Sequence, residues 1–430
     1  MDANNTALWV ALAEALGPRS AHLSPLLAHF GSPAAVFAAS EAELLEACPA
    51  LKGSTLRQLC VTPPYARAAQ ILKYCSCHGV TVLTPDDAAY PAPLRTISAP
   101  PAVLYCLGTL PLFGQQPTVG VVGARHFDAY GAGMAYKLSF EMGAAGAAIV
   151  SGLAEGIDGI AAAAALEAGA KTVAVLGTGI DRVYPKHHKR LFSEVAEFGA
   201  VLTEFAPGTP PNAWNFPMRN RLISALSDAL VVVQAGENSG SLITARYALF
   251  QGKPLFAVPG NADSPLAIGT NRLLRAGAML CASAEDVLSH FRFLYPDLKI
   301  SAVPPEACQY SMLSPEILRA HGIVAPSVQG KTAPTKQKRR KEQACVDTDG
   351  AVEAPVAPDA TDVPPTVLAE ALSSLSARER ALYERLPDAP FTVDVLVSPE
   401  VGVAAAVSAM TLFEILGLVK ADVGGTYVKL

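Results

Sequence analysis

The chain has 430 residues, 51% of them hydrophobic and 17% charged, so it can build packed cores and is too long for one ordinary domain. Lys and Arg number 33 against 38 Asp and Glu, which gives a formal net charge of -5. This balance excludes a protein whose whole surface is positively charged and binds nucleic acid. It still allows a local basic groove, because phosphate affinity depends on where the basic side chains lie.

Neither a membrane span nor a secretion signal is expected. No run of about 18 uncharged apolar residues occurs. The first apolar stretch, residues 7–12, is followed by Glu14, as in an amphipathic helix. The eight cysteines are scattered, and Cys75 and Cys77, the one close pair, lack Cys-x-x-Cys spacing. We therefore expect free, buried thiols in a cytoplasmic protein.

Helix signals dominate residues 1–87. Gly17 and Gly31 separate short apolar periodic stretches, and Ser40 with Glu43 has the spacing of a capping box. Short helices joined by glycine-containing turns predict a small N-terminal helical domain of the helix-hairpin-helix or SAM-like kind. Modules of this kind grip the DNA backbone in some proteins and make protein or structural contacts in others, and the sequence leaves both open.

Residues 88–298 show the pattern of an α/β domain. Short apolar runs rich in β-branched residues alternate with amphipathic stretches such as residues 130–142 and 156–168. This alternation predicts an extended Rossmann-like, doubly wound and mostly parallel sheet. The runs interpreted as buried strands are residues 118–122, 147–150, 172–176, 229–233 and 254–258.

The composition changes again after residue 298. Proline, alanine and charged residues dominate residues 299–365, which we interpret as a disordered linker. Its basic run at residues 336–341 is typical of a solvated stretch and could also hold nucleic acid weakly. In residues 366–430, helical stretches at 371–386 and 403–416 precede two short strand-like runs around a Gly-Gly turn, which predicts a winged helix.

Glycine-rich turns follow the expected strands repeatedly. Each alone is ordinary turn chemistry, and none is a Gly-x-Gly-x-x-Gly or a Gly-x-x-x-x-Gly-Lys-Ser/Thr loop. Together they lie at the carboxyl edge of a parallel sheet, where backbone N–H groups and helix dipoles favour anions. They therefore predict a ligand that carries phosphate. The turns are residues 123–125, 151–158, 177–181, 239–244 and 259–260.

A basic element strengthens this prediction. Arginine offers paired donors to phosphate oxygens, and asparagine can bond a base edge or the backbone. The alternative is that the arginines are surface groups in salt bridges to neighbouring helices. The element is the string Phe216-Pro217-Met218-Arg219-Asn220-Arg221.

Lys186 adds positive charge after the third expected strand, together with His187 and His188. Two adjacent histidines cannot both face one metal on a helix, so we expect no metal site there and interpret them as a solvent-exposed helix N-terminus. Asp158, at the start of another expected helix, is interpreted as a helix cap.

No catalytic constellation stands out in the sequence. A Gly-x-Ser-x-Gly elbow, a His-Glu-x-x-His motif and paired carboxylates in a plausible setting are all missing. We therefore expect a binding protein with no catalytic residue, no metal and no cofactor.

In combination, the motifs resemble the DNA-processing protein A family, DprA, also called Smf. The resemblance covers about residues 90–288, and several motifs in the family's order are far more specific than any one of them. The matching strings are Val121-Val122-Gly123-Ala124-Arg125, Ser151-Gly152-Leu153-Ala154-x-Gly156-Ile157-Asp158, Leu176-Gly177-Thr178-Gly179, Phe216-Pro217-x-Arg219-Asn220-Arg221, Ser239-Gly240-Ser241-Leu242-Ile243-Thr244-Ala245, Val258-Pro259-Gly260 and Gly269-Thr270-Asn271.

This resemblance implies a homodimer that binds single-stranded DNA in the Rossmann-like core. It also implies that the protein loads the RecA recombinase onto DNA taken up in natural transformation and displaces single-strand-binding protein, without cofactor or turnover. The residues that it implies at the phosphate pocket are Gly123, Arg125, Ser151, Gly152, Arg219, Asn220, Arg221, Ser239, Gly240, Ser241 and Thr244, with Lys186 as a further candidate.

Three features depart from the family's pattern. Glu155 puts an acid into the second turn, and Gln234 stands where an acid is common. In the segment that resembles the family's winged helix, acidic residues outnumber basic ones. For that segment we therefore expect a protein contact, or a very weak DNA contact.

The alternative, from a different class, is an enzyme. Rossmann-like nucleotide phosphoribohydrolases of the lysine-decarboxylase-like group also begin with a Gly-x-Arg turn. They add a Pro-Gly-Gly-x-Gly-Thr-x-x-Glu signature, whose glutamate serves the glycosidic-bond chemistry. Residues 235–245, at the corresponding turn, have no glutamate at that spacing, so the sequence favours the binding protein.

Overall fold

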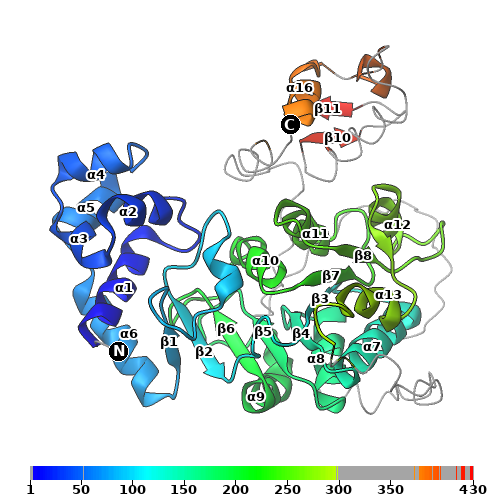
Figure 1. Cartoon of the computed structure of the whole chain (residues 1–430), viewed down its shortest axis with the longest axis horizontal. Helices are drawn as coiled ribbons and strands as arrows, with labels where there is room; N and C mark the ends of the chain where they lie inside the picture. The colour runs from blue at the N-terminus through cyan, green and yellow to red at the C-terminus, as the bar shows by residue number, and fades with distance from the viewer. Residues whose placement is uncertain are drawn as a thin grey trace, which may run out of the picture.

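The computed structural model describes most of the first 298 residues and parts of the C-terminal segment. It contains an N-terminal group of helices, a nine-stranded sheet with helices on both faces, and a small two-stranded element (Figure 1). The described residues are 3–51, 53–296, 298, 372, 377–389, 391–396, 398, 413, 418–421 and 427–429.

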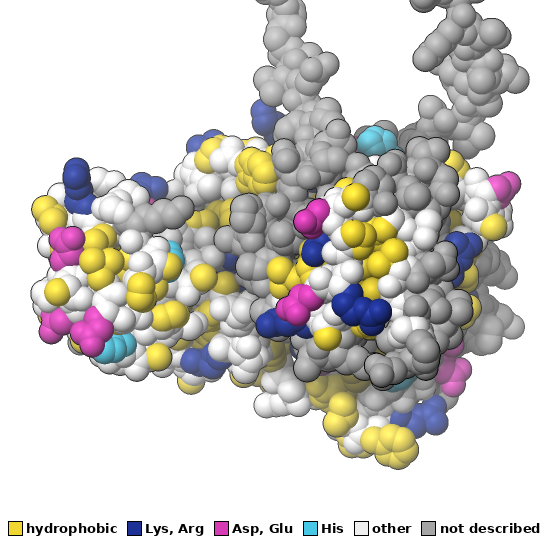
Figure 2. Space-filling model, turned by 90° about the horizontal axis from the view of Figure 1, so that it is seen from above, with side chains coloured by type: hydrophobic (Ala, Val, Ile, Leu, Met, Phe, Trp, Pro, Cys, Tyr) yellow, Lys and Arg dark blue, Asp and Glu magenta, His cyan; other side chains and the backbone are white. Residues whose placement is uncertain are grey.

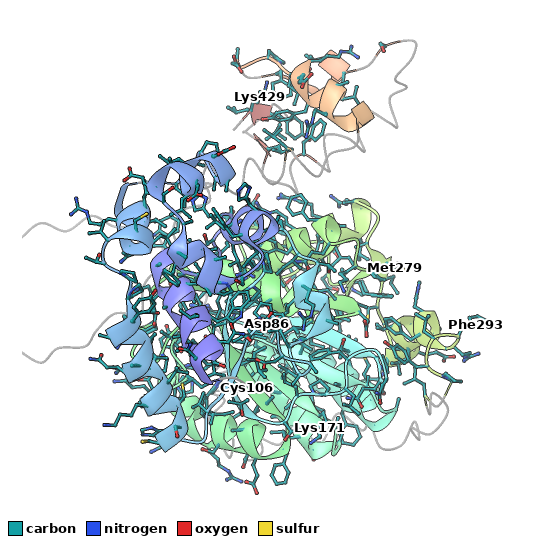
Figure 3. All side chains as sticks on the ribbon, turned by 60° about the vertical axis from the view of Figure 1, so that its left-hand side comes forward. Asp86, Cys106, Lys171, Met279, Phe293 and Lys429 are labelled. Carbon is teal, nitrogen blue, oxygen red and sulfur yellow. The ribbon has the colours of Figure 1, made fainter. Side chains whose placement is uncertain are left out.

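The N-terminal helices are short. Ser40 and Glu43 form the predicted capping box, in which the Glu43 carboxylate accepts from Ser40 N at 2.8 Å. Asp86, which follows the first strand, is bonded to the first helix: its Oδ2 accepts a hydrogen bond from Trp9 Nε1 at 2.6 Å (Figure 3). The helices are α1 (Ala3–Leu16), α2 (Leu23–Phe30), α3 (Pro33–Ala38), α4 (Glu41–Ala47), α5 (Gly53–Cys60) and α6 (Tyr65–Cys77).

The sheet has the strand order β1-β2-β6-β5-β4-β3-β7-β8-β9. From β6 to β9 in this order every pairing is parallel, whereas β2 pairs antiparallel with both β6 and β1. The strands are β1 (Thr81–Leu83), β2 (Leu104–Gly108), β3 (Thr118–Val122), β4 (Ala148–Ser151), β5 (Thr172–Val175), β6 (Ala200–Thr203), β7 (Ala229–Val232), β8 (Leu255–Ala257) and β9 (Met279–Leu280).

Helices cover both faces of the sheet (Figure 1). One face packs against α7 (Ala129–Ala144), α8 (Ile157–Glu167), α9 (Lys189–Phe198) and α13 (Ala284–Leu288). The other packs against α10 (Asn215–Ala225), α11 (Ser241–Phe250) and α12 (Ile268–Arg275). Short 3-10 turns lie at η1 (Ala92–Arg95), η2 (Lys186–His188) and η3 (Ser289–Phe291).

Successive strand residues alternate between two cores. In β7, Ala229 and Val231 join the core beneath α7 and α8, whereas Leu230 and Val232 join the core beneath α10 and α11. Because side chains along a strand point alternately to opposite faces, a strand buried on both faces is apolar throughout. This explains why the five central runs are continuous apolar stretches rather than alternating ones. The first core continues into the N-terminal helices.

The prediction of a mixed α/β fold with a large, mostly parallel sheet is confirmed. The five expected strands correspond to β3, β4, β5, β7 and β8, and the two expected helices correspond to α7 and α8. The sequence analysis did not find β1, β2, β6 or β9. These four strands have two to five residues each, and the strands that were found have three to five, so length alone does not explain the difference.

The C-terminal segment is described only in part. It includes α16 (Ala377–Glu384), η6 (Val393–Leu396) and the antiparallel pair β10 (Val419–Ala421) and β11 (Tyr427–Lys429). Phe250, at the end of α11, packs against its apolar cluster. The predicted linker at 299–365 lies outside the described residues, as does nearly all of the predicted helix at 403–416.

Within the described part of the chain, every helix is too short or too polar to cross a lipid bilayer. The described cysteines are free, and Cys48, Cys75, Cys106 and Cys281 are buried as expected, although Cys77 is exposed. Burial raises the pKa of the Cys75 thiol to about 11, so this thiol stays protonated and unreactive at neutral pH.

Candidate nucleic-acid interface

The parallel part of the sheet reverses its order at β3. The chain moves outward from β3 through β4, β5 and β6, and then returns to β7 on the other side of β3. In open α/β sheets, ligands bind at the carboxyl ends of the strands at such a reversal. The turns after β3 and β7 flank this point, and the turn after β4 is next to it.

The turns after β3 and β4 are packed closely against the start of α8. A Cβ on Gly123 would lie 2.6 Å from Ile157 Cγ1, so glycine is required for this approach. The buried Ser151 hydroxyl donates to Val121 O at 2.6 Å. Both residues therefore shape the turns, and the Ser151 hydroxyl already has an acceptor within the protein.

Asp158 lies beneath the turn after β4. Its Oδ2 accepts a hydrogen bond from Gly152 N at 3.1 Å. Burial raises the pKa of Asp158, and the positive charge of Arg219 opposes this effect. The interpretation of Asp158 as a helix cap is wrong: Gly156 occupies the N-cap position of α8, and the Asp158 carboxylate bonds the preceding turn instead. A backbone N–H that was expected to receive phosphate is thus already bonded to a carboxylate of the chain itself.

Arg219 is buried beside Asp158, only 4% exposed. Its Nη1 donates to Gly152 O at 2.8 Å and also to Val175 O. A Cβ on Gly152 would lie 2.7 Å from Arg219 Nη2, so this packing requires glycine. Burial lowers the pKa of Arg219 to about 10, which still leaves it a cation at neutral pH. Arg219 supports the turn from below and is not the surface arginine of the alternative interpretation.

Arg125 is exposed and lies over the ring of Phe216, with 5.4 Å between its Cζ and the ring centroid. The Cζ of Arg219 lies 5.9 Å from the same centroid. Tyr184 contacts this ring as well, at 5.4 Å between centroids. Phe216 therefore orders two guanidinium groups, one buried and one open to solvent, through cation–π contacts.

Asn220 connects α10 to the turn after β7. Its Oδ1 accepts from Arg219 Nε at 3.2 Å, and its Nδ2 donates to Gly240 O at 3.4 Å. Gly240 itself is exposed. In the same turn the Ser239 and Ser241 hydroxyls bond each other at 2.8 Å. Thr244, one turn further along α11, is buried.

Arg221 points away from this arrangement. Residues two positions apart on a helix lie about 200° apart around its axis, so Arg219 and Arg221 leave α10 on opposite sides. The Arg221 Nη2 pairs with Glu204 Oε2, and Glu204 Oε1 accepts from the backbone N of Arg19 at 3.0 Å. The structure thus separates Arg221 from the other predicted site residues and places it at the junction with the N-terminal helices. The sequence analysis missed Glu204, an acid directly after β6.

Lys186 is exposed on η2, as is His187, but His188 is fully buried. The expectation of two solvent-exposed histidines is therefore wrong for His188, whose Nδ1 lies 3.1 Å from Leu153 O. Leu153 has a positive φ of 52°, an uncommon conformation for a residue with a side chain. His188 thus helps to hold the turn after β4 in an unfavourable backbone conformation.

The α/β core is similar to known proteins. DNA processing protein DprA of Bacillus subtilis is 40% identical over 223 residues, which cover 52% of this chain and 75% of the relative. DNA processing protein DprA of Streptococcus pneumoniae is 42% identical over 211 residues, covering 48% of this chain and 73% of the relative. The model of the family DNA recombination-mediator protein A matches residues 81–292. The chain belongs to the DNA recombination-mediator protein A family.

The fold agrees with membership of this DNA recombination-mediator family. The X-ray structure of DNA processing protein A (DprA) from Streptococcus pneumoniae has a TM-score of 0.59 and 31% identity, covering 67% of this chain and 98% of the solved one. The matched region spans β1 to η3 and contains every predicted site residue. The family consists of DNA-binding recombination mediators and not of enzymes, so the phosphoribohydrolase alternative is set aside. Among the described residues, no cluster of three or more His, Cys, Asp or Glu side chains could hold a metal ion.

Proposed function

We propose that this protein binds single-stranded DNA at the carboxyl edge of its sheet and acts as a recombination mediator. The observation that carries the proposal is the exposed Arg125 guanidinium, ordered by Phe216 above the buried pair of Arg219 and Asp158. An exposed cation on a rigid support can meet a phosphate without losing much side-chain freedom on binding.

The predicted site residues divide into two groups in this proposal. The exposed ones, Arg125, Lys186 and Gly240, contact the DNA backbone. The buried ones hold the turns in shape, since their polar groups already have partners inside the protein or are closed off from solvent. This second group consists of Ser151, Gly152, Arg219, Asn220, Ser241 and Thr244, with the half-buried Gly123 and Ser239 at its rim and Arg221 at the junction with the N-terminal helices.

A local site fits the charge of the molecule better than an extended basic surface. Basic and acidic side chains are interspersed over the face seen in Figure 2, and the chain as a whole carries a net charge of -5. Binding at such a site depends on a few phosphate contacts, each of which releases counterions, so affinity falls as salt rises.

The cellular role follows from the family resemblance. We propose that the protein acts in the cytoplasm as a homodimer, loads the RecA recombinase onto single-stranded DNA during natural transformation and displaces single-strand-binding protein. We also propose that residues 366–430 form a winged helix that contacts protein, because acidic residues outnumber basic ones there.

Binding of labelled oligo-dT at two salt concentrations tests the site. Replacing Arg125 by Ala should weaken binding about tenfold and lower the slope of log affinity against log salt by about one, because one phosphate contact is lost. Lys171, an exposed lysine just before β5 at the opposite, amino edge of the sheet (Figure 3), provides the matched control, and Lys171→Ala should bind like the wild type.

Two results would contradict the proposal. Wild-type binding that does not respond to salt would exclude a phosphate-based site, and release of adenine from AMP incubated with the protein would indicate an enzyme. If Arg125→Ala and Lys171→Ala bind equally well, the activity stands and the assignment of the site is wrong.

A further inference from the structure

Trp214 is a large aromatic side chain exposed on the same edge of the sheet as the proposed DNA site. It is 54% exposed and lies at the N-cap position of α10, two residues before Phe216. It follows β6, so it is at the carboxyl edge, together with Arg125 and Gly240. Isolated apolar residues are common on protein surfaces, and the surroundings of Trp214 therefore decide what it does.

The loop that carries Trp214 is anchored at residues 207 and 208 by two other parts of the chain. Arg67, from α6, donates to Pro207 O at 3.1 Å, and Gly208 N donates to Asp181 Oδ1 at 2.7 Å. Close to Trp214 itself, Asn215 N donates to Asn212 O at 3.0 Å. The indole is therefore presented on a backbone fixed by hydrogen bonds.

The segment that carries Trp214 has no acidic side chain of its own, and Asp181, which bonds it at Gly208, is paired with Arg182. From residue 205 to residue 227 the chain contains no Asp or Glu. The preceding acid, Glu204, is paired internally with Arg221. Phe216, two residues further along the chain from Trp214, carries the guanidinium groups of Arg125 and Arg219, whereas the Trp214 ring is open to solvent at the start of the same helix.

We propose that Trp214 is a stacking platform for an unpaired nucleobase, on the same edge of the sheet as the phosphate contact of Arg125. This inference rests on the proposed function and adds to it a basis for preferring single strands. Aromatic side chains stack on bases of any sequence, but the faces of bases inside a duplex are already covered by their neighbours. A phosphate contact alone would not distinguish the two forms.

The chain contains two tryptophans, which makes the test direct. Trp9 is 2% exposed and bonded to Asp86, so a change in tryptophan fluorescence on adding oligo-dT reports on Trp214. We expect wild-type fluorescence to be quenched by oligo-dT and much less by a duplex of equal length. Fluorescence of the Trp214→Phe variant, which keeps only Trp9, should not change.

Affinity measurements separate stacking from charge. Trp214→Ala should bind oligo-dT about fivefold to a hundredfold more weakly, with an unchanged salt slope because no phosphate contact is lost, and Trp214→Phe should retain most of the affinity. Phe198 is the matched control: it is 57% exposed but lies before β6 at the amino edge, and Phe198→Ala should bind like the wild type.

The outcomes distinguish the two proposals. If the wild-type protein binds no oligonucleotide, the proposed function fails and this inference fails with it. If wild-type binding is salt-sensitive but Trp214→Ala binds equally well and Trp214 fluorescence does not change, only the inference is overturned.

Discussion

At the scale of single residues, the buried pair of Asp158 and Arg219 determines how the turn after β4 is held. The Asp158 carboxylate accepts a hydrogen bond from the N–H of Gly152, and the Arg219 guanidinium donates one to the carbonyl of Gly152. The two backbone groups of this glycine are therefore bonded to side chains of opposite charge. Taking either charge out of water is costly, and the two are tolerated because each has partners. The turn is therefore shaped before any ligand arrives.

Replacing Asp158 by Asn should lower the free energy of unfolding by about 1.5–3 kcal/mol, because the Gly152 N–H would lose a charged acceptor and the buried Arg219 a neighbouring negative charge. Urea unfolding measures this. The control is Glu194→Gln, which removes the exposed ion pair with Arg190 and should change stability by at most about 1 kcal/mol. An Asp158→Asn protein as stable as the wild type would show that Arg219 does not depend on this carboxylate.

His188 should make stability depend on pH. Burial lowers the pKa of its imidazole below the ordinary value of 6.5, so the folded protein keeps the ring neutral where the unfolded chain takes up a proton. The unfolded state then binds more protons, and the free energy of unfolding falls as the pH decreases below about 6.5, by at most about 1.4 kcal/mol per pH unit from this group. The neighbouring charged or titratable groups are His187 and Glu155.

The His188→Asn variant tests this effect, since an amide can still donate to Leu153 O and does not titrate. Urea unfolding at pH 7.5, 6.5 and 5.5 should give a smaller loss of stability toward low pH in the variant than in the wild type. Seven other histidines are common to both proteins and cancel in the comparison. Equal pH dependence in the two proteins would rule out a neutral, buried His188.

At the scale of elements, α10 contacts both the strand-end turns and the junction with the N-terminal helices. One side of the helix carries Arg219 and Asn220 to the strand-end turns, and the other carries Arg221 to Glu204. Through the backbone N of Arg19, Glu204 also connects β6 to the segment between α1 and α2. The N-terminal helices are thus attached to the core on the other side of α10 from the proposed DNA site.

This junction should be sensitive to removal of one charge. Glu204→Gln should lower the free energy of unfolding by about 3–5 kcal/mol, because Arg221 would be left buried without an opposite charge. Replacing both by apolar residues, Glu204→Leu with Arg221→Met, should cost less than the single change, since no unpaired charge remains. If the double variant is the less stable of the two, the pair contributes net stability and this interpretation fails.

At the scale of the whole molecule, the proposed DNA contacts lie on one edge of the sheet. Arg125, Lys186 and Gly240 come from three loops far apart in sequence, and the parallel strands bring those loops to the same edge. On the face seen in Figure 2, side chains of both signs are mixed. An acidic protein can in this way present a local cationic site.

The sequence by itself determined the α/β class, the five central strands and the family. Those strands are apolar along their whole length because both faces of the sheet are covered, and that pattern is visible without coordinates. The motifs also located the strand-end turns, because glycine is required wherever a helix or side chain packs directly on the backbone, as at Gly123 and Gly152.

Only the tertiary structure decided which site residues face solvent. In sequence, Arg219 and Arg221 are equivalent arginines around an amide, yet one supports a turn with Asp158 and the other joins the N-terminal helices through Glu204. Helix geometry sends the two side chains in opposite directions, but what each one meets depends on loops far away in the chain. Burial of this kind is a property of packing, so the motif predicts a position for the proposed site but not which of its residues are open to solvent.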